Sequence, residues 1–187
     1  MRNNQDRLGA VPGGETPPTQ QAEQSLQFVT PTEFVELPSR GKHYPPGHAL
    51  HNVETIEIRH MTAKDEDILT SSALLRKGIA IDRLLKNVIV NKAIDVADLL
   101  VGDKNALILA SRISGYGSDY EAAVTCPGCS SSVKFEFDLN QCQAISDSKH
   151  EEQDVVMTEN NTFMIHVDKL DCDVEVKLLT SRDEIEM

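Results

Sequence analysis

Four cysteines are the residues of this 187-residue chain best suited to chemistry, and two of them lie in the pattern Cys126-Pro127-Gly128-Cys129. A gap of two residues lets both thiolates face one zinc ion, while the Pro and Gly between them shape the turn. A redox-active pair would place its first cysteine at the start of a helix, where the pKa of that thiol is lowered. Serines and an alternating strand pattern follow instead, so the motif favours a zinc knuckle over a redox centre.

A closed structural zinc site needs four ligands, and no second pair of cysteines has this spacing. The residues that could complete the site are Cys142, Cys172, His150 and His166. One candidate site, which would hold one structural zinc ion, uses every cysteine of the chain: Cys126, Cys129, Cys142 and Cys172. A knuckle without metal is an equally good interpretation. A catalytic zinc is disfavoured, because no His-Glu base lies beside a ligand cluster.

Other signatures of catalysis do not occur in the sequence. It contains no glycine-rich phosphate loop, nucleophile elbow, kinase signature or HExxH motif. The carboxylate pairs Asp65/Glu66 and Asp183/Glu184 each follow a threonine at a predicted helix start, where the helix dipole accounts for them without chemistry. We therefore expect a protein that is not an enzyme, and a zinc- or thiol-dependent enzyme stays only as a third hypothesis.

The charge of the chain excludes several classes of partner. A net charge of −12 argues against nucleic acid, whose phosphates require a basic surface, and against an anionic membrane surface. No apolar run has the length needed to span a bilayer. We expect a protein kept in a reducing cytoplasm, where the cysteines are thiols or metal ligands rather than disulfides.

One structural unit occurs twice in the sequence. Residues 56–66 and 174–184 match almost in step, and each alternates β-branched with charged residues before a Thr that precedes an Asp by three positions. The alternation predicts a half-buried strand, and the Thr and Asp predict a capped helix directly after it. A repeated unit of this kind indicates a building block rather than a catalytic motif. The second copy stops at Met187, so we expect either a truncated chain or a last turn that docks on a partner.

The remaining patterns predict an α+β protein in three parts. Residues 1–27 are rich in Gln, Pro, Gly and Thr and predict a disordered arm, either solvated or ordered against a neighbouring subunit. Residues 28–118 predict a strand followed by a small helical bundle. Residues 119–187 predict an antiparallel β meander with the zinc-knuckle-like turn, a polar loop at 143–154 and the second strand–helix unit.

Apolar spacing in the middle of the chain predicts the helices of the bundle. One helix begins at Thr62 and stops at Gly78, and a second apolar stretch covers residues 79–90. Further helix starts are offered by Asp95 and Asp98, and Asp103 is expected to cap a helix that runs through Ile113.

The most basic segment of this acidic chain, residues 37–47, is a candidate partner-binding loop. Its pattern combines Pro for a fixed φ with Gly for a positive φ, as turns require. A lid over the following strand is the alternative interpretation. The candidate partner-binding residues are Leu37, Pro38, Ser39, Arg40, Gly41 and Tyr44.

A series of short motifs carries a family resemblance. In chain order they are Leu37-Pro38-Ser39-Arg40-Gly41 with Tyr44, residues 58–62 with Asp65-Glu66, Asp103, Arg112-Ile113 with Gly115-Tyr116-Gly117 and Tyr120, and the CxxC motif. In this order they resemble the T-even-type bacteriophage baseplate hub proteins, over residues 35–187. Residues 56–59 with Thr62 also look like small phage tail-assembly chaperones.

The resemblance implies a non-enzymatic structural subunit of a contractile tail, with other baseplate hub and tail proteins as its partners. It also implies a location in the host cytoplasm during assembly and in the virion tail baseplate if the subunit is retained. The alternative that it leaves open is a transient assembly chaperone that is absent from the mature virion.

Overall fold

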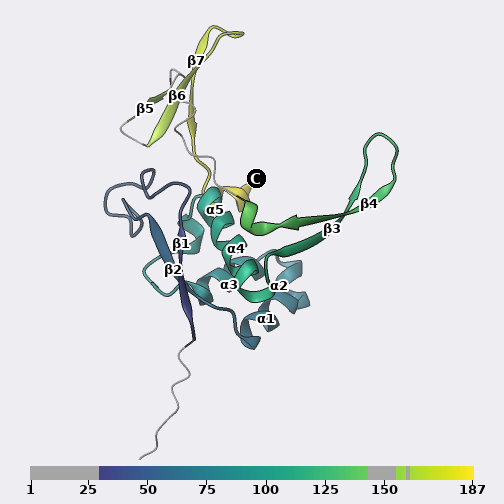
Figure 1. Ribbon diagram of the computed structural model, residues 1–187. Helices are drawn as coiled ribbons and strands as arrows, with labels where there is room; N and C mark the ends of the chain where they lie inside the picture. The colour runs from purple at the N-terminus through teal and green to yellow at the C-terminus, as the bar shows by residue number, and fades with distance from the viewer. Residues whose placement is uncertain (1–29, 143–154, 159–160) are drawn as a thin grey trace, which may run out of the picture.

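The computed structural model describes residues 30–142, 155–158 and 161–187. A compact body holds four helices and one small sheet, and two further sheets project from it in different directions (Figure 1). The α+β class is therefore as predicted. The predicted disordered arm, the polar loop at 143–154 and His150 lie outside the described residues.

The first sheet of the body joins two strands across a long loop. Strand β1 (Thr32–Glu36) pairs antiparallel with β2 (Thr55–Arg59), and Val35 lies opposite Ile56. Alternation along these strands buries Val35, Ile56 and Ile58, as the sequence pattern predicts. A bridge between Ile58 and Ile89 attaches the segment after the third helix to the second edge of β2.

The helices of the body differ from the prediction in two places. Residues 62–78 form two short helices, α1 (Ala63–Thr70) and α2 (Ser72–Arg76), because the backbone of Ser71 is extended. Helix α4 (Val101–Tyr116) has Leu100 at its N-cap, so Asp103 lies inside the first turn and does not cap it. The carboxylate of Asp103 is used by a distant loop instead, as described below.

Two other helix predictions are confirmed, whereas Asp98 does not start a helix. The predicted apolar stretch at 79–90 forms α3 (Ala80–Val88), whose buried face includes Leu84, Leu85 and Val88. The short 3-10 helix η2 (Val96–Asp98) is capped by Asp95, which accepts from the N–H of Ala97. Together with β1, β2 and the loop between them, these helices enclose one aliphatic core.

The predicted β meander is divided between two sheets. Strands β3 (Asp119–Thr125) and β4 (Ser132–Asp138) form a long hairpin that is followed by the 3-10 helix η3 (Leu139–Gln141). Strands β5 (Val156–Met157), β6 (Thr162–Val167) and β7 (Cys172–Lys177) form a separate antiparallel sheet. Helix α5 (Ser181–Glu186) follows β7 and returns to the body.

Lys104, in the first turn of α4, joins α4 to α3 and α5. Lys104 is almost fully buried and its Nζ lies 3.0 Å from Asp82 Oδ1 on α3. The same ammonium group donates to the hydroxyl of Ser181 and lies 3.3 Å from Glu184, so it also attaches α5. A bridge between Leu100 and Thr180 completes this junction. The short α5 is therefore held by contacts with its own chain.

The repeated strand–helix unit is confirmed. Strand β2 runs into α1 and β7 runs into α5, and both helices begin with a capping box. In the first copy, the carboxylate of Asp65 accepts from the N–H and the hydroxyl of Thr62 at 2.9 and 2.8 Å. In the second copy, Asp183 accepts from the same two groups of Thr180 at 3.0 and 2.8 Å.

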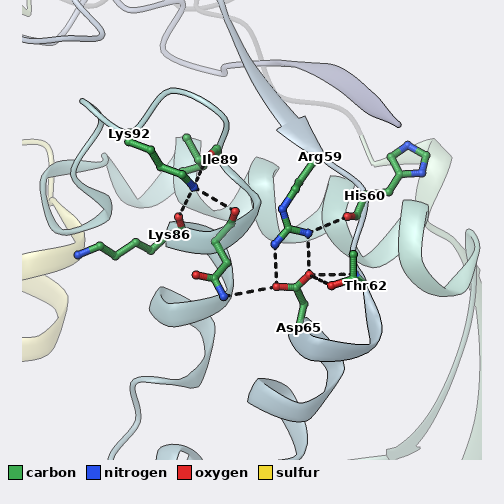
Figure 2. Close-up of polar contacts among 8 residues, drawn as sticks. Arg59, His60, Thr62, Asp65, Lys86, Ile89 and Lys92 are labelled. Atoms are coloured by element: carbon green, nitrogen blue, oxygen red, sulfur yellow. Dashed lines mark hydrogen bonds and ion pairs between the residues drawn. The ribbon is translucent and has the colours of Figure 1, made fainter. Parts of the chain in front are cut away.

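A cation from the preceding strand completes each copy. Arg59 donates two hydrogen bonds to Asp65, at 2.7 and 3.0 Å, and Figure 2 shows Arg59 and Thr62 converging on this carboxylate. Lys177 occupies the matching position and lies 2.6 Å from Asp183. Nearby, the ammonium group of Lys92 donates to three carbonyl groups at the end of α3, among them that of Ile89.

The two copies lie in different environments. The side chain of Asp65 is 1% exposed, whereas that of Asp183 is 22% exposed and its partner Lys177 is 59% exposed. Burial alone would raise the pKa of Asp65, but hydrogen bonds from Arg59 and Thr62 together hold it well below its ordinary value. A hydrogen bond from Lys177, followed by those from Thr180, lowers the pKa of Asp183 to about 2.

We predict that Asp65→Asn lowers the free energy of unfolding at pH 7 by about 1.5 to 3 kcal/mol, the range for hydrogen bonds to charged groups. The loss arises because the half-buried Arg59 no longer faces a carboxylate. Urea denaturation monitored by circular dichroism would measure it. Asp183→Asn is the matched control, and it should cost less because its ion pair is exposed to solvent. Equal losses in the two variants would contradict this difference between the copies.

We also predict that the wild-type advantage over Asp65→Asn depends on pH. A carboxyl group whose folded pKa is depressed stabilises the protein fully above its unfolded pKa, which is about 4. That stabilisation is lost as the pH falls from about 4 toward the folded pKa. Urea denaturation at several pH values should therefore show the two proteins converging in strongly acidic buffer. A difference that stays constant with pH would contradict the prediction.

Candidate functional site

The CxxC motif forms the tip of the β3–β4 hairpin. The N–H of Cys126 donates to the carbonyl of Ser131, and the N–H of Ser130 donates back to the carbonyl of Cys126. The hydroxyl of Ser131 lies 2.9 Å from Sγ of Cys129, and this hydrogen bond lowers the pKa of the Cys129 thiol. The tip therefore presents an exposed thiol with an increased fraction of thiolate, next to a second thiol.

The other two cysteines lie elsewhere in the fold. Cys142 follows η3 at the base of the hairpin, about 20 Å from the tip along strands of this length. Cys172 begins β7 in the separate sheet, where His166 is hydrogen-bonded to Asp173. Over residues 30–142, 155–158 and 161–187, no cluster of three or more His, Cys, Asp or Glu side chains could hold a metal ion.

The structure thus brings Cys126 and Cys129 together and does not bring Cys142 to them. The tip supplies two of the four ligands that a closed zinc site requires. A zinc ion bound at the tip would need further ligands from another molecule or another arrangement of the chain. The four-cysteine zinc site stays a prediction.

The loop between β1 and β2 is attached to α4 by a buried carboxylate. Asp103 accepts from the N–H and the hydroxyl of Ser39 at 3.0 and 2.6 Å. It also accepts from the hydroxyl of Tyr44 at 2.7 Å, and that hydroxyl in turn accepts from the N–H of Leu100. Burial raises the pKa of Tyr44 above its ordinary value, and Asp103 raises it further although the Leu100 bond acts the other way. The phenol therefore stays neutral.

The six candidate partner-binding residues fall into a buried or hydrogen-bonded group and an exposed group. Leu37 and Tyr44 are buried in the core, and Ser39 is bound to Asp103. Gly41 is also buried and has φ +70, and a Cβ there would lie 2.3 Å from the backbone nitrogen of Val53. Only Pro38 and Arg40 are exposed. Direct partner contact at this loop stays a prediction, and these two side chains are the ones in a position to make it.

Both exposed residues line an open groove on the body. The groove has a volume of about 640 Å³, and its walls come from the end of β1, the side of α4 and η3. Its lining is mostly aliphatic, with Glu36 and Arg40 among the exceptions. The remaining lining residues are Val35, Leu37, Pro38, Gly102, Asn105, Ala106, Leu109, Ala110, Ile113, Leu139, Asn140 and Cys142.

The β3–β4 hairpin has one apolar and one charged face. Opposite residues in an antiparallel pair share a face, so the register gathers a set that we call the hairpin face. Its members are Tyr120, Ala122, Val124, Val133, Phe135 and Phe137. The large side chains of this set are all exposed, Phe135 by 55%. The opposite face carries Glu121, Lys134 and Glu136, so the hairpin is amphipathic and its apolar side meets solvent.

The β5–β7 sheet has the same organisation. Its register gathers an apolar set that we call the sheet face. Its members are Met157, Phe163, Ile165, Val167, Cys172, Val174 and Val176. Phe163 contacts the ring of His43 from the β1–β2 loop, and Met157 is 54% exposed. Sequence alternation predicted these strands, but it could not show that much of their apolar side stays exposed among the described residues.

Arg112 helps to fix the hairpin to the body. Arg112 near the end of α4 donates to the carbonyl of Gly117 at 2.8 Å and to that of Asp119 at 3.4 Å. Its guanidinium group also lies over the rings of Tyr116 and Tyr120. These contacts set the direction in which β3 leaves the body. The motif Arg112 to Tyr120, which carried part of the family resemblance, therefore has a structural role.

Comparison with known protein families shows a match over most of the chain. The model of a family described as T4 bacteriophage base plate protein matches residues 30–183. No curated protein matches the chain significantly, and no solved structure does so. Among the residues that the structure describes, no helix has the length and apolar character needed to cross a membrane.

We predict that Tyr44→Phe lowers the free energy of unfolding by about 2 kcal/mol, within the range for leaving buried polar groups unpaired. The change removes a donor to Asp103 and the acceptor of the Leu100 N–H. Urea denaturation would measure the loss. Tyr116→Phe is the matched control, since Tyr116 is half-exposed, and it should leave stability nearly unchanged. A Tyr44→Phe variant as stable as the control would show that this network does not hold the loop.

Proposed function

We propose that this chain, which belongs to the T4 bacteriophage base plate protein family, is a non-enzymatic structural subunit of the baseplate hub of a contractile phage tail. It acts through protein–protein contacts during tail assembly. Its partners are other baseplate hub and tail proteins rather than nucleic acid or membrane. Under this proposal it works in the host cytoplasm during assembly and in the virion tail once incorporated.

The exposed hairpin face is the observation that supports contact as the function. A two-stranded hairpin is marginally stable in water unless its apolar side packs against something. Here the large apolar side chains of both strands lie on one side and are about half exposed, while charged residues occupy the other side. A contiguous apolar surface on a soluble body marks a site of protein association. The sheet face offers a second surface of the same kind.

The division between body and projecting sheets supports the same proposal. The charged groups that are buried in the body, Asp65, Asp103 and Lys104, are all occupied by internal partners. Their arrangement accounts for packing and capping and leaves none of them facing a substrate-sized enclosed cavity. Most of the exposed large apolar side chains among the described residues lie on β3–β7, with Phe34 on β1 as an exception on the body. A subunit that docks by surface complementarity requires this distribution.

A transient assembly chaperone, absent from the mature virion, is the second candidate function. The modest size of each apolar face favours it, because contacts of small area are compatible with release. A retained structural subunit and a transient chaperone would use the same apolar surfaces, so few structural features distinguish these two roles. Composition of the finished particle separates the two.

We predict that mass spectrometry of purified virions of the parent phage detects peptides of this chain in a fixed ratio to other baseplate proteins. The chain should also be present in isolated assembly intermediates. Peptides found in intermediates but not in virions would instead support the chaperone role. Absence from both would overturn the proposed function.

We also predict that Phe135→Asp prevents the chain from entering baseplates, because it places a charge in the centre of the hairpin face. Complementation of a phage that lacks the wild-type gene, followed by analysis of purified tails, would measure incorporation. Thr125→Asp adds the same charge on the opposite side of the hairpin and should be incorporated normally. Equal incorporation of both variants would exclude the hairpin face as a docking surface.

A further inference from the structure

The chain carries two apolar faces that match each other. The hairpin face consists of six side chains on two seven-residue strands, and the sheet face of seven side chains on two six-residue strands and the two-residue β5. Each has charged residues on its reverse side, including Glu121 and Lys134 on one sheet and Glu175 and Lys177 on the other. Two amphipathic antiparallel sheets of this kind can pack face to face, about 10 Å apart, with both charged sides in water.

The two faces are held apart within one chain. Strand β3 begins at the C-terminal end of α4, where Arg112 holds it. The segment after β7 is attached to the N-terminal end of α4 by the Leu100–Thr180 bridge. The sixteen residues of α4 separate these ends by about 24 Å. The two sheets point away from the body in different directions (Figure 1). Packing within one chain would require one of these attachments to break, and packing between two copies would not.

We propose that the hairpin face of one copy packs on the sheet face of a second copy, so that the protein associates head to tail. This inference goes beyond the proposed function and concerns the chain alone. The contact uses different surfaces on its two sides, so an open assembly keeps one free hairpin face at one end and one free sheet face at the other. Contacts of this type produce a ring when the rotation closes and a filament when it does not.

The size and charge of the surfaces determine the strength of the contact. Covering both faces would bury on the order of 1,000 Å² in total, near the lower end for specific interfaces. Each copy also carries a net charge of −12, so copies repel one another at low ionic strength. Salt screens this repulsion without weakening apolar contact, so association should strengthen as salt concentration rises. An ion-paired interface would show the opposite dependence.

The test is sedimentation of the purified full-length chain and of two variants. Phe135→Asp blocks the hairpin face and Ile165→Asp blocks the sheet face. The wild-type chain should form dimers and larger species at concentrations up to about 100 μM, corresponding to micromolar contacts. Each variant alone should be monomeric. An equimolar mixture should form a heterodimer and nothing larger, because one intact face of each kind remains. Thr125→Asp, on the charged side of the hairpin, should associate like the wild type.

The mixture also controls for folding, since a misfolded variant could not restore the heterodimer. A wild-type chain that is monomeric over the whole concentration range would overturn the proposal. So would a mixture that stays monomeric, or an Ile165→Asp variant that still associates with itself, which would indicate pairing between identical hairpin faces. None of these results bears on incorporation into virions, so failure here is distinguishable from failure of the proposed function.

Discussion

The first turn of α4 is the point on which the arrangement of the molecule depends. Two adjacent and oppositely charged residues, Asp103 and Lys104, are buried there, and each points to a different part of the chain. Asp103 holds the β1–β2 loop through Ser39 and Tyr44, and Lys104 holds α3 and α5. Buried charges are costly unless they are paired and hydrogen-bonded, so few alternative arrangements of these segments would be tolerated.

The body and the projecting sheets differ in how much of their apolar surface is covered. The body closes around an aliphatic core, and its buried charged groups Asp65, Asp103 and Lys104 have internal partners, whereas the buried hydroxyl of Ser111 has no hydrogen-bond partner among the described residues. Among the described residues, β3 is attached at its base through Arg112 and β7 through the Leu100–Thr180 bridge, and Phe163 of β6 also contacts the ring of His43. The side chains of the apolar faces of these sheets are mostly exposed among the described residues, as expected for a subunit of a base plate.

The repeated strand–helix unit shows how one local design serves two positions. In both copies an Asp at the start of a helix accepts from a Thr cap and from a cation on the preceding strand. The local sequence is enough to form this arrangement, because all three partners lie within seven residues of each other. In the first copy the unit is covered by the body, and in the second it is the connection between a projecting sheet and α4.

The sequence by itself determined the features that depend on neighbouring residues. Alternation predicted β3, β4, β6 and β7, the Thr and Asp spacing predicted both capped helices, and the order of short motifs predicted the family that the comparison confirmed. Tertiary structure decided what depends on distant partners. It broke the helix at Ser71, used Asp103 to hold a loop 64 residues away instead of a cap, and left Cys142 far from the CxxC tip. The reason is that periodicity in the sequence shows which side of a helix or strand is apolar. The groups that cover that side, and the distant partner of a buried charge, depend on how the helices and strands pack together.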